Sequence, residues 1–393
     1  MWLNGLNIQE QALKLLPYGV LIFLFFMFAA PTSKVANQVF YLGVLLPALL
    51  SFKLLFKNKS LSTALWPIVS VIFFWAFFSF ISFEQAGWDN VGKLFRHALY
   101  VITFISASYY LLLTKLVSVR KLAACLFILA ASYSALSFIS FYWLDGHALT
   151  ARLSPILRLN SPIFVPIILT VFGMPLMQWL IENKKGEQAI AVFLTMLFFL
   201  YFYNSRSAMV GLFFGVIGLI FLGSNLNQKR FASFLFLLVL SSLTLSYFYG
   251  NILNRGGSYR IDIWVSGLNK IADCGWLLGC GFGENSDIII NSGRRFQHAH
   301  NLFLSHLINT GLFGLLSLLG GLFYTLYQGI KVKAMMTLGL LVGCAALFFD
   351  GHSIITNPDD IWLIFWLPLI MTSWDINNAQ KKCVAESTHS QGT

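Results

Sequence analysis

The sequence predicts an all-α polytopic membrane protein, and three observations predict this class. Of the 393 residues, 58% are hydrophobic and only 10% are charged, which is far from the composition of a soluble domain of this length. Apolar runs that approach the roughly 20 residues of a bilayer crossing recur along the chain. The loops between these runs alternate between lysine-rich and arginine-rich, and an alternation of charged residues from loop to loop is typical of multi-pass proteins.

We predict about twelve transmembrane helices in a single domain, residues 1–376, followed by a polar and disordered tail, residues 377–393. The first span is expected to stay as an anchor, because no small-residue cleavage site follows the apolar run that ends at Ala30. Tyr203 and Arg206 are assigned to a break between two spans, because an unpaired guanidinium at mid-bilayer would be costly. The predicted spans are 15–30, 37–56, 64–83, 98–113, 122–144, 163–181, 189–203, 208–222, 231–249, 302–327, 334–349 and 361–374.

The cations of the loops predict the orientation of the chain. One set of alternate loops, together with Lys14 and the polar tail, holds fifteen cations, of which thirteen are lysine. By the positive-inside rule this set, with both chain termini, is predicted to face the cytoplasm. The opposite set holds eleven cations, of which eight are arginine, and is predicted to form the outer face.

This outer face has the composition of a phosphate-binding site. Lysine is adequate for topology, whereas the planar guanidinium of arginine holds phosphate oxygens through two parallel hydrogen bonds. Six of the seven histidines also fall on or near this face. One shared site would explain both enrichments, although any single arginine could instead extend toward lipid headgroups. The six histidines are His97, His147, His298, His300, His306 and His352.

A large polar loop, residues 250–301, separates the predicted ninth and tenth spans and is the expected location of the chemistry. Residues 258–273 are predicted to form an amphipathic helix at the outer membrane interface. Arg260 and Asp262 lie roughly 160° apart on this helix, so they cannot pair with each other. Arg260 is therefore predicted to point at a ligand, unless it is an ordinary interfacial arginine. The apolar face comprises Ile261, Trp264, Val265, Leu268 and Ala272.

The glycines that follow, Gly279, Gly281 and Gly283, predict tight turns, because no strand precedes them as one does in a nucleotide-binding loop. His300 then precedes the tenth span, where the positive end of the helix dipole and nearby arginines favour a neutral imidazole. A neutral imidazole is the form that a general base needs. His298 is predicted to orient the loop or to contact an acceptor.

The sequence predicts no metal site. It contains no Asp-x-Asp, no His-Glu-x-x-His and no cysteine pair at zinc spacing. Asp359 and Asp360 form a carboxylate pair in an outer loop that could hold a divalent ion, although their position before a span favours a solvated loop end. Cys274 and Cys280 share the large loop, where an oxidising compartment would permit a disulfide; the sequence does not favour the bridge and does not decide it.

Three short motifs, in a fixed order along the chain, carry a resemblance. They are Ser205-Arg206-Ser207 between two spans, Tyr259-Arg260 leading into Trp264, and His298-Ala-His300-Asn301 followed by Gly311-Leu-Phe-Gly314. With twelve spans and one dominant loop between the ninth and tenth, the chain resembles the bacterial O-antigen ligase and polymerase superfamily, and its ligase branch in particular. The resemblance covers nearly the whole chain in topology and a few residues in each motif.

The resemblance implies a GT-C-like membrane glycosyltransferase that needs no metal or other cofactor and inverts the anomeric centre. It implies transfer of a glycan from undecaprenyl pyrophosphate to a sugar hydroxyl of lipid A-core, on the periplasmic face of the bacterial inner membrane. The expected partners are these two lipid-linked substrates and membrane lipids, with no nucleic acid.

Residue by residue, the resemblance assigns Arg206 and Arg260 to the donor diphosphate and His300 to removal of the acceptor proton. His298 and Asn301 are expected to contact substrate beside that histidine. The departure of a diphosphate needs stabilisation of negative charge and no general acid, which suits arginine side chains. The rival bases are Asp262, Glu284 and Asp350.

Arg152 is also assigned to substrate binding, although Pro155 stands where the superfamily usually has glycine. Three other functions stay open on sequence alone. A polymerase of the same superfamily usually presents two comparable outer loops, and a protein O-oligosaccharyltransferase often carries an extra exoplasmic domain. A lipid-glycan transporter would place charges or broken helices near the midplane, whereas most predicted spans here carry no ionisable residue.

Overall fold

The computed structural model describes residues 8–57, 65–81, 88–222, 259–282 and 287–390, together with Ser233. Most of the described residues are helical, which confirms the predicted all-α class. The two short strands among them form one antiparallel pair, in which Ile288 faces Phe296 and Ile289 faces Arg295.

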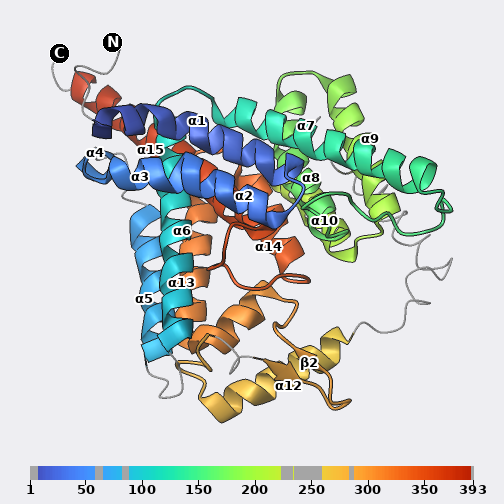
Figure 1. Cartoon of the computed structure of the whole chain (residues 1–393). Helices are drawn as coiled ribbons and strands as arrows, with labels where there is room; N and C mark the ends of the chain where they lie inside the picture. Colours follow the sequence, from blue (N-terminus) through green and yellow to red (C-terminus); the bar gives the residue numbers. More distant parts are fainter. Residues whose placement is uncertain are drawn as a thin grey trace.

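Figure 1 labels the elements in chain order, and three π-helical turns (η) continue directly into neighbouring α-helices. The elements are α1 (Ile8–Ala29), α2 (Ser33–Phe40), η1 (Tyr41–Leu45), α3 (Leu46–Leu50), α4 (Phe52–Lys57), α5 (Leu65–Ile81), α6 (Trp88–Leu113), α7 (Val119–Phe138), η2 (Ile139–Leu144), α8 (Phe164–Glu182), α9 (Gly186–Tyr203), α10 (Arg206–Leu222), α12 (Arg260–Cys274), β1 (Ile288–Ile289), β2 (Arg295–Phe296), α13 (Leu302–Lys331), α14 (Thr337–Leu347), η4 (Trp362–Trp366) and α15 (Leu367–Ser390).

Each predicted apolar segment that the structure describes contains a helix, and the segment 231–249, apart from Ser233, lies outside the described residues. By length and composition, six helices in the described part of the chain could cross a membrane. α9 and α10 are separate, as predicted, because Asn204 adopts a left-handed φ of 46° and ends α9. The chain is therefore a multi-pass helical protein, and the total of twelve crossings stays a prediction.

In Figure 1, α5, α6 and α13 run beside one another, and α12 with the hairpin lies far from the two chain ends. Aromatic rings hold the three helices together. Trp75 of α5 stacks on Phe313 of α13 with ring centroids 4.8 Å apart, and Phe77 of α5 contacts Phe95 of α6 at 4.6 Å. α12, in the loop that carries the predicted chemistry, packs on α13 of this group of apolar helices.

α10 and α14 pack closely in antiparallel directions. A Cβ on Gly215 would lie 2.8 Å from Val342, and a Cβ on Gly218 would lie 2.6 Å from Leu338, so glycine allows this approach. From Gly215 to Gly218 the residue numbers rise along α10, while those of the facing residues in α14 fall from Val342 to Leu338. Consequently Arg206, the first residue of α10, lies at the same end of this helix pair as the segment that follows α14.

Loops predicted to share a side of the membrane do meet in the structure. Nη2 of Arg158, in the loop before α8, donates to the carbonyl oxygen of Pro358, in the loop before η4, at 2.8 Å. The backbone N–H of Arg158 donates, at 3.1 Å, to the carbonyl oxygen of Ala30, the residue that follows α1. On the predicted cytoplasmic side, Arg120 and Lys185 lie over the ring of Trp179 at 4.6 and 5.4 Å. The predicted alternation of loops therefore agrees with the fold.

Two elements differ from the sequence prediction. α13 is interrupted at Gly311, whose φ of 65° and ψ of −168° are not helical, whereas one continuous span is predicted over 302–327. α15 extends as a helix to Ser390, through the tail that is predicted to be disordered. The tail can continue the helix of the last span because elongation of an existing helix needs no new nucleus.

Candidate active site

Asp350 joins two residues that the sequence singles out in the large loop. Its Oδ2 accepts a hydrogen bond from Nη2 of Arg260 at 2.9 Å, and its Oδ1 lies 3.1 Å from Nδ1 of His300. The Asp350 side chain is 5% exposed, whereas Arg260 and His300 are 23% and 34% exposed. Because an ionised carboxylate only accepts hydrogen bonds, Nδ1 of His300 is the donor, and in the neutral imidazole Nε2 would then carry the lone pair.

Three segments that are distant in sequence bring these side chains together. Arg260 is the first residue of α12, His300 precedes α13, and Asp350 follows α14. His300 has a φ of 48°, which is uncommon for a residue other than glycine. Asn301 caps α13, and its side-chain oxygen accepts from the backbone N–H groups two and three residues later at 3.0 Å. The cap holds the turn that carries His300.

α12 is fastened to the same turn. Nε1 of Trp264 donates to the carbonyl oxygen of Ala299 at 3.0 Å. The amphipathic helix predicted over 258–273 is confirmed, but it has an additional apolar face, because Ile263 and Ile271 are buried in a small core with Ile308 of α13. Four residues of the predicted face are exposed, as a face that contacts lipid would be, and these are Ile261, Val265, Leu268 and Ala272.

Two further histidines adjoin His300. The His298 ring lies 4.4 Å from the His300 ring and 5.7 Å from the His352 ring, measured between centroids. Burial, followed by the charges of these two neighbours, lowers the pKa of His298 to about 4. His298 is therefore neutral at pH 7, and the three rings form one polar surface beside Asp350.

His352 is held by a carboxylate of its own. Its Nε2 lies 2.9 Å from Oδ2 of Asp359. Burial lowers the pKa of His352, but the hydrogen bond and the charge of Asp359 outweigh burial and raise the pKa above its usual value. The neighbouring Asp360 lies 3.5 Å from Nη1 of Arg158. The carboxylate pair predicted to be a solvated loop end is thus engaged by a histidine and an arginine.

The remaining predicted arginines lie at the junction of α9 and α10. Nε of Arg152 donates to the carbonyl oxygen of Tyr203 at 2.8 Å. The backbone N–H of Leu153 donates to the carbonyl oxygen of Phe202 at 3.0 Å. Arg206 begins α10 at this junction and is half-buried. The packing of α10 on α14 puts the junction at the end of the helix pair where Asp350 follows α14.

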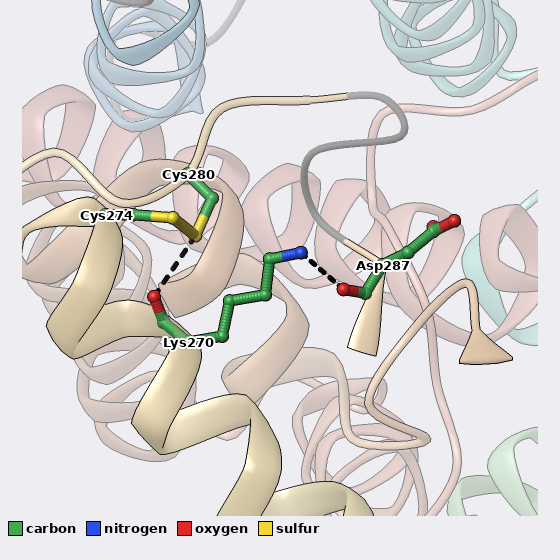
Figure 2. Close-up of a disulfide and its surroundings, with 4 residues drawn as sticks. All are labelled: Lys270, Cys274, Cys280 and Asp287. Atoms are coloured by element: carbon green, nitrogen blue, oxygen red, sulfur yellow. Dashed lines mark hydrogen bonds between the residues drawn. A yellow bond between two sulfur atoms is a disulfide. The ribbon is translucent and has the colours of Figure 1, made fainter. Parts of the chain in front are cut away.

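Cys274 and Cys280 form a disulfide, which the sequence did not favour and left undecided. Figure 2 shows the bridge between the last residue of α12 and the turn after it. The Cα atoms are 5.0 Å apart, a distance that the tight turn produces and that sequence spacing alone does not reveal. Gly275, Gly279 and Gly281 have φ of 103°, 72° and 76°, which confirms the predicted tight turns, while Gly283 lies outside the described residues.

Among the residues that the structure describes, no group of three or more histidine, cysteine or carboxylate side chains is arranged to hold a metal ion. Sequence reasoning treated Asp350 as a rival base at the end of a span and did not foresee its two partners. The available signal was its position, since it is a carboxylate at an outer helix end in a chain that has few acidic residues. Its rivals are placed elsewhere, because Asp262 points away from Arg260 on α12 and Glu284 lies outside the described residues.

The fold and the cluster together define a multi-pass membrane protein with an arginine, a carboxylate and an imidazole in contact at the ends of its helices. Residues 191–319 match the family model described as O-antigen ligase. This stretch runs from α9 into α13 and contains Arg206, Arg260 and His300.

The chain is also similar to an O-antigen ligase of Pseudomonas aeruginosa, with 26% identity over 377 residues, which cover 91% of this chain and 89% of the relative. The two comparisons agree with the motifs, and both support the O-antigen ligase family of membrane-embedded enzymes.

Proposed function

We propose that this protein transfers a glycan from undecaprenyl pyrophosphate to a sugar hydroxyl of lipid A-core, without a metal and with inversion. The observation that carries the proposal is the contact of Asp350 with both Arg260 and His300. It joins a candidate phosphate-binding group and a candidate base through one buried carboxylate. Such an arrangement suits a reaction in which a proton leaves one substrate while a diphosphate leaves the other.

The proposed chemistry balances without a further reactant. The acceptor hydroxyl oxygen attacks the anomeric carbon of the donor, and its proton passes to Nε2 of His300. The new carbon–oxygen bond forms as the bond between the anomeric carbon and the phosphate oxygen breaks, and the electron pair stays on the diphosphate. Attack from the side opposite the leaving group inverts the anomeric centre. Asp350 then stabilises the imidazolium that forms.

The arginines serve the leaving group in this proposal. A guanidinium has five N–H donors on three nitrogen atoms. In the structure, Nη2 of Arg260 donates to Asp350. The other donors of Arg260, with those of Arg206 and Arg152, would hold the diphosphate oxygens. His298, neutral at pH 7, would contact the acceptor sugar, and Asn301 would contribute mainly by holding the turn of His300.

The site is proposed to face the periplasm, with both termini in the cytoplasm and twelve helices of GT-C-like arrangement in the bacterial inner membrane. The positive-inside distribution supports this orientation. The disulfide between Cys274 and Cys280 also supports it, because disulfides persist in the periplasm and are rare in the cytoplasm. The exposed apolar face of α12 is consistent with a helix at the outer interface.

Reconstitution tests the reaction and its nearest rival together. Purified protein in lipid nanodiscs would receive undecaprenyl-pyrophosphate-linked glycan with or without lipid A-core, and mass spectrometry would identify the products. We expect glycan on lipid A-core. Chains that lengthen on the lipid carrier without lipid A-core would instead identify a polymerase. EDTA should leave the rate unchanged, and loss of activity that a divalent cation restores would refute the metal-free mechanism.

Arginine variants test the donor site in the same assay. Arg206→Ala and Arg260→Ala should each remove several kcal/mol of transition-state stabilisation, on the order of 3 kcal/mol, if charge develops on the leaving group. Arg120→Ala is the matched control, since Arg120 stacks on Trp179 at the opposite side of the fold. Equal losses in all three variants would contradict a specific donor site.

A further inference from the structure

α13 is broken where the loop after α12 inserts its backbone. The N–H of Leu312 donates to the carbonyl oxygen of Trp276 at 2.8 Å, and that of Phe313 donates to Leu277 at 3.4 Å. In the reverse direction, the N–H of Cys280 donates to Ile308 at 2.6 Å, and that of Gly281 donates to Asn309 at 3.1 Å. The loop thus bonds the backbone groups on both sides of the break at Gly311. These bonds matter in an apolar span, where unpaired backbone groups are costly. We call residues 275–281 the insert.

Two glycines make the contact possible. A Cβ on Gly279 would lie 2.5 Å from the carbonyl oxygen of Ile308, and a Cβ on Gly311 would lie 2.2 Å from the carbonyl oxygen of Leu277. Both residues also have positive φ, of 72° and 65°. Since both clashes are with backbone atoms, a larger residue at either position would separate the insert from α13.

The disulfide closes the insert into a ring with the end of α12. Cys274 ends α12 and is half-buried, whereas Cys280, which donates its N–H into α13, is 1% exposed. Figure 2 shows Sγ of Cys280 beside the carbonyl oxygen of Lys270, at 3.7 Å, and Nζ of Lys270 donating to the carbonyl oxygen of Asp287. The same turn of α12 therefore holds both the insert and the segment that leads into β1.

The insert and the site share their two supporting helices. α12 begins with Arg260 and ends with the disulfide, while the first half of α13, Leu302–Thr310, begins after His300 and ends at the insert. Trp264 links α12 to the His300 turn at 3.0 Å. Asp350 comes from a different element, after α14. Whatever fixes the half-helix against α12 therefore also fixes Arg260 and His300 relative to each other.

We propose that the Cys274–Cys280 disulfide is a positioning device whose reduction by a small dithiol reversibly lowers catalysis. This inference rests on the proposed function of the same site. In the step, a dithiol thiolate attacks Sγ of Cys274, the sulfur–sulfur bond breaks, and Cys280 leaves as a thiolate. The second sulfur of the dithiol then displaces Cys274 and closes its own disulfide. Two electrons pass to the protein, and the dithiol is oxidised.

Transfer rates and amide hydrogen exchange on the full-length protein in nanodiscs test the proposal. Dithiothreitol should lower kcat by roughly 10- to 100-fold with little change in KM for the donor, because a small displacement of the base slows chemistry more than binding. Reoxidation should restore the rate. Exchange should quicken in peptides that cover residues 276–282 and 302–313 and stay unchanged in α8.

Two variants provide the controls. Cys274→Ser with Cys280→Ser should show the reduced rate with or without dithiothreitol. Cys125→Ala, Cys344→Ala and Cys383→Ala combined, which removes the free cysteines of the described residues, should respond to dithiothreitol as the unmodified protein does. An unchanged kcat in the reduced protein would overturn the proposal, as would faster exchange spread evenly over all helices. If the oxidised protein transfers no glycan, the proposed function fails, whereas the exchange experiment still tests whether the disulfide holds the break.

Discussion

Two histidine–aspartate pairs lie in one cluster and use opposite ring nitrogens. His300 contacts Asp350 through Nδ1 at 3.1 Å, whereas His352 contacts Asp359 through Nε2 at 2.9 Å. Asp350 also accepts a hydrogen bond from Arg260. Asp359 instead accepts, at 3.0 Å, from a backbone N–H at the start of the last span. The first carboxylate joins two side chains of the candidate site, and the second fastens a loop to a helix.

The difference teaches that a carboxylate beside a histidine does not by itself identify a base. In His300 the ring nitrogen farthest from the backbone, Nε2, is not the one bound to Asp350, so in the neutral ring it can accept a proton from a substrate. In His352 that nitrogen is the one bound to Asp359. Of the three predictions that follow, the first two compare one pair with the other, and the third compares His352 with the neighbouring His298.

Replacing the histidines should produce the largest difference. His300→Gln should lower the transfer rate by about 100- to 10,000-fold while donor binding persists, because proton removal is lost. His352→Gln should lower it by less than about tenfold, since that side chain touches no reacting atom in the proposal. Single-turnover rates and donor binding in nanodiscs would measure both effects. Comparable losses in the two variants would remove the distinction between the pairs.

Replacing the carboxylates should have a smaller effect. Asp350→Asn should reduce transfer by roughly 10- to 100-fold, because the amide keeps the shape of the side chain but loses the charge that orients and stabilises the imidazolium. Asp359→Asn should mainly lower thermal stability. The double variant of Asp350→Asn with His300→Gln should be no slower than His300→Gln alone, since both act on one proton transfer. Multiplying losses would indicate a separate role for Asp350.

The dependence of stability on pH should show the smallest effect, with opposite signs for two neighbouring histidines. Asp359 raises the pKa of His352 above 6.5, so the stability that this pair contributes is full below that pH and is lost as the pH rises through the folded-state pKa. The pKa of His298 is lowered to about 4, so its contribution is present above pH 6.5 and is lost as the pH falls toward 4.

Thermal midpoints measured between pH 4 and 9, a range of about five units that spans both titrations, would test these signs. His352→Gln should remove part of the loss on the alkaline side, and His298→Gln should remove part of the loss on the acid side. A change on the same side in both variants would contradict the assignment of Asp359 to His352.

Much of the fold was predictable because membrane spans are encoded locally. A run of apolar residues forms a helix in lipid whatever its neighbours are, since its backbone groups must bond within the segment. The division at Asn204 was also predictable from local sequence, because the nearby charged residue Arg206 marks the end of a span. The break at Gly311 was not, because the bonds that replace those of the helix come from an insert about 30 residues earlier in the chain.

The site was predictable in part. Arg260 and His300 stand out because a cation and an imidazole are rare in such an apolar chain and lie in its large polar loop. Asp350 was left among several rival bases, since a carboxylate at a helix end has many possible partners. The disulfide could not be decided from the sequence, because Cys274 and Cys280 are separated by a turn whose geometry depends on its contact with α13.

By itself the sequence determined the class, the helices, the alternation of the loops and the motifs of the O-antigen ligase family, all of which depend on neighbouring residues or on composition. Only the tertiary structure decided that Asp350 binds both Arg260 and His300, that Asp359 binds His352, and that a bridged loop fills the break in α13. The contacts of Asp350 join residues that are 50 and 90 positions apart in the sequence. Their geometry is set by the packing of the helices, which no local sequence pattern encodes.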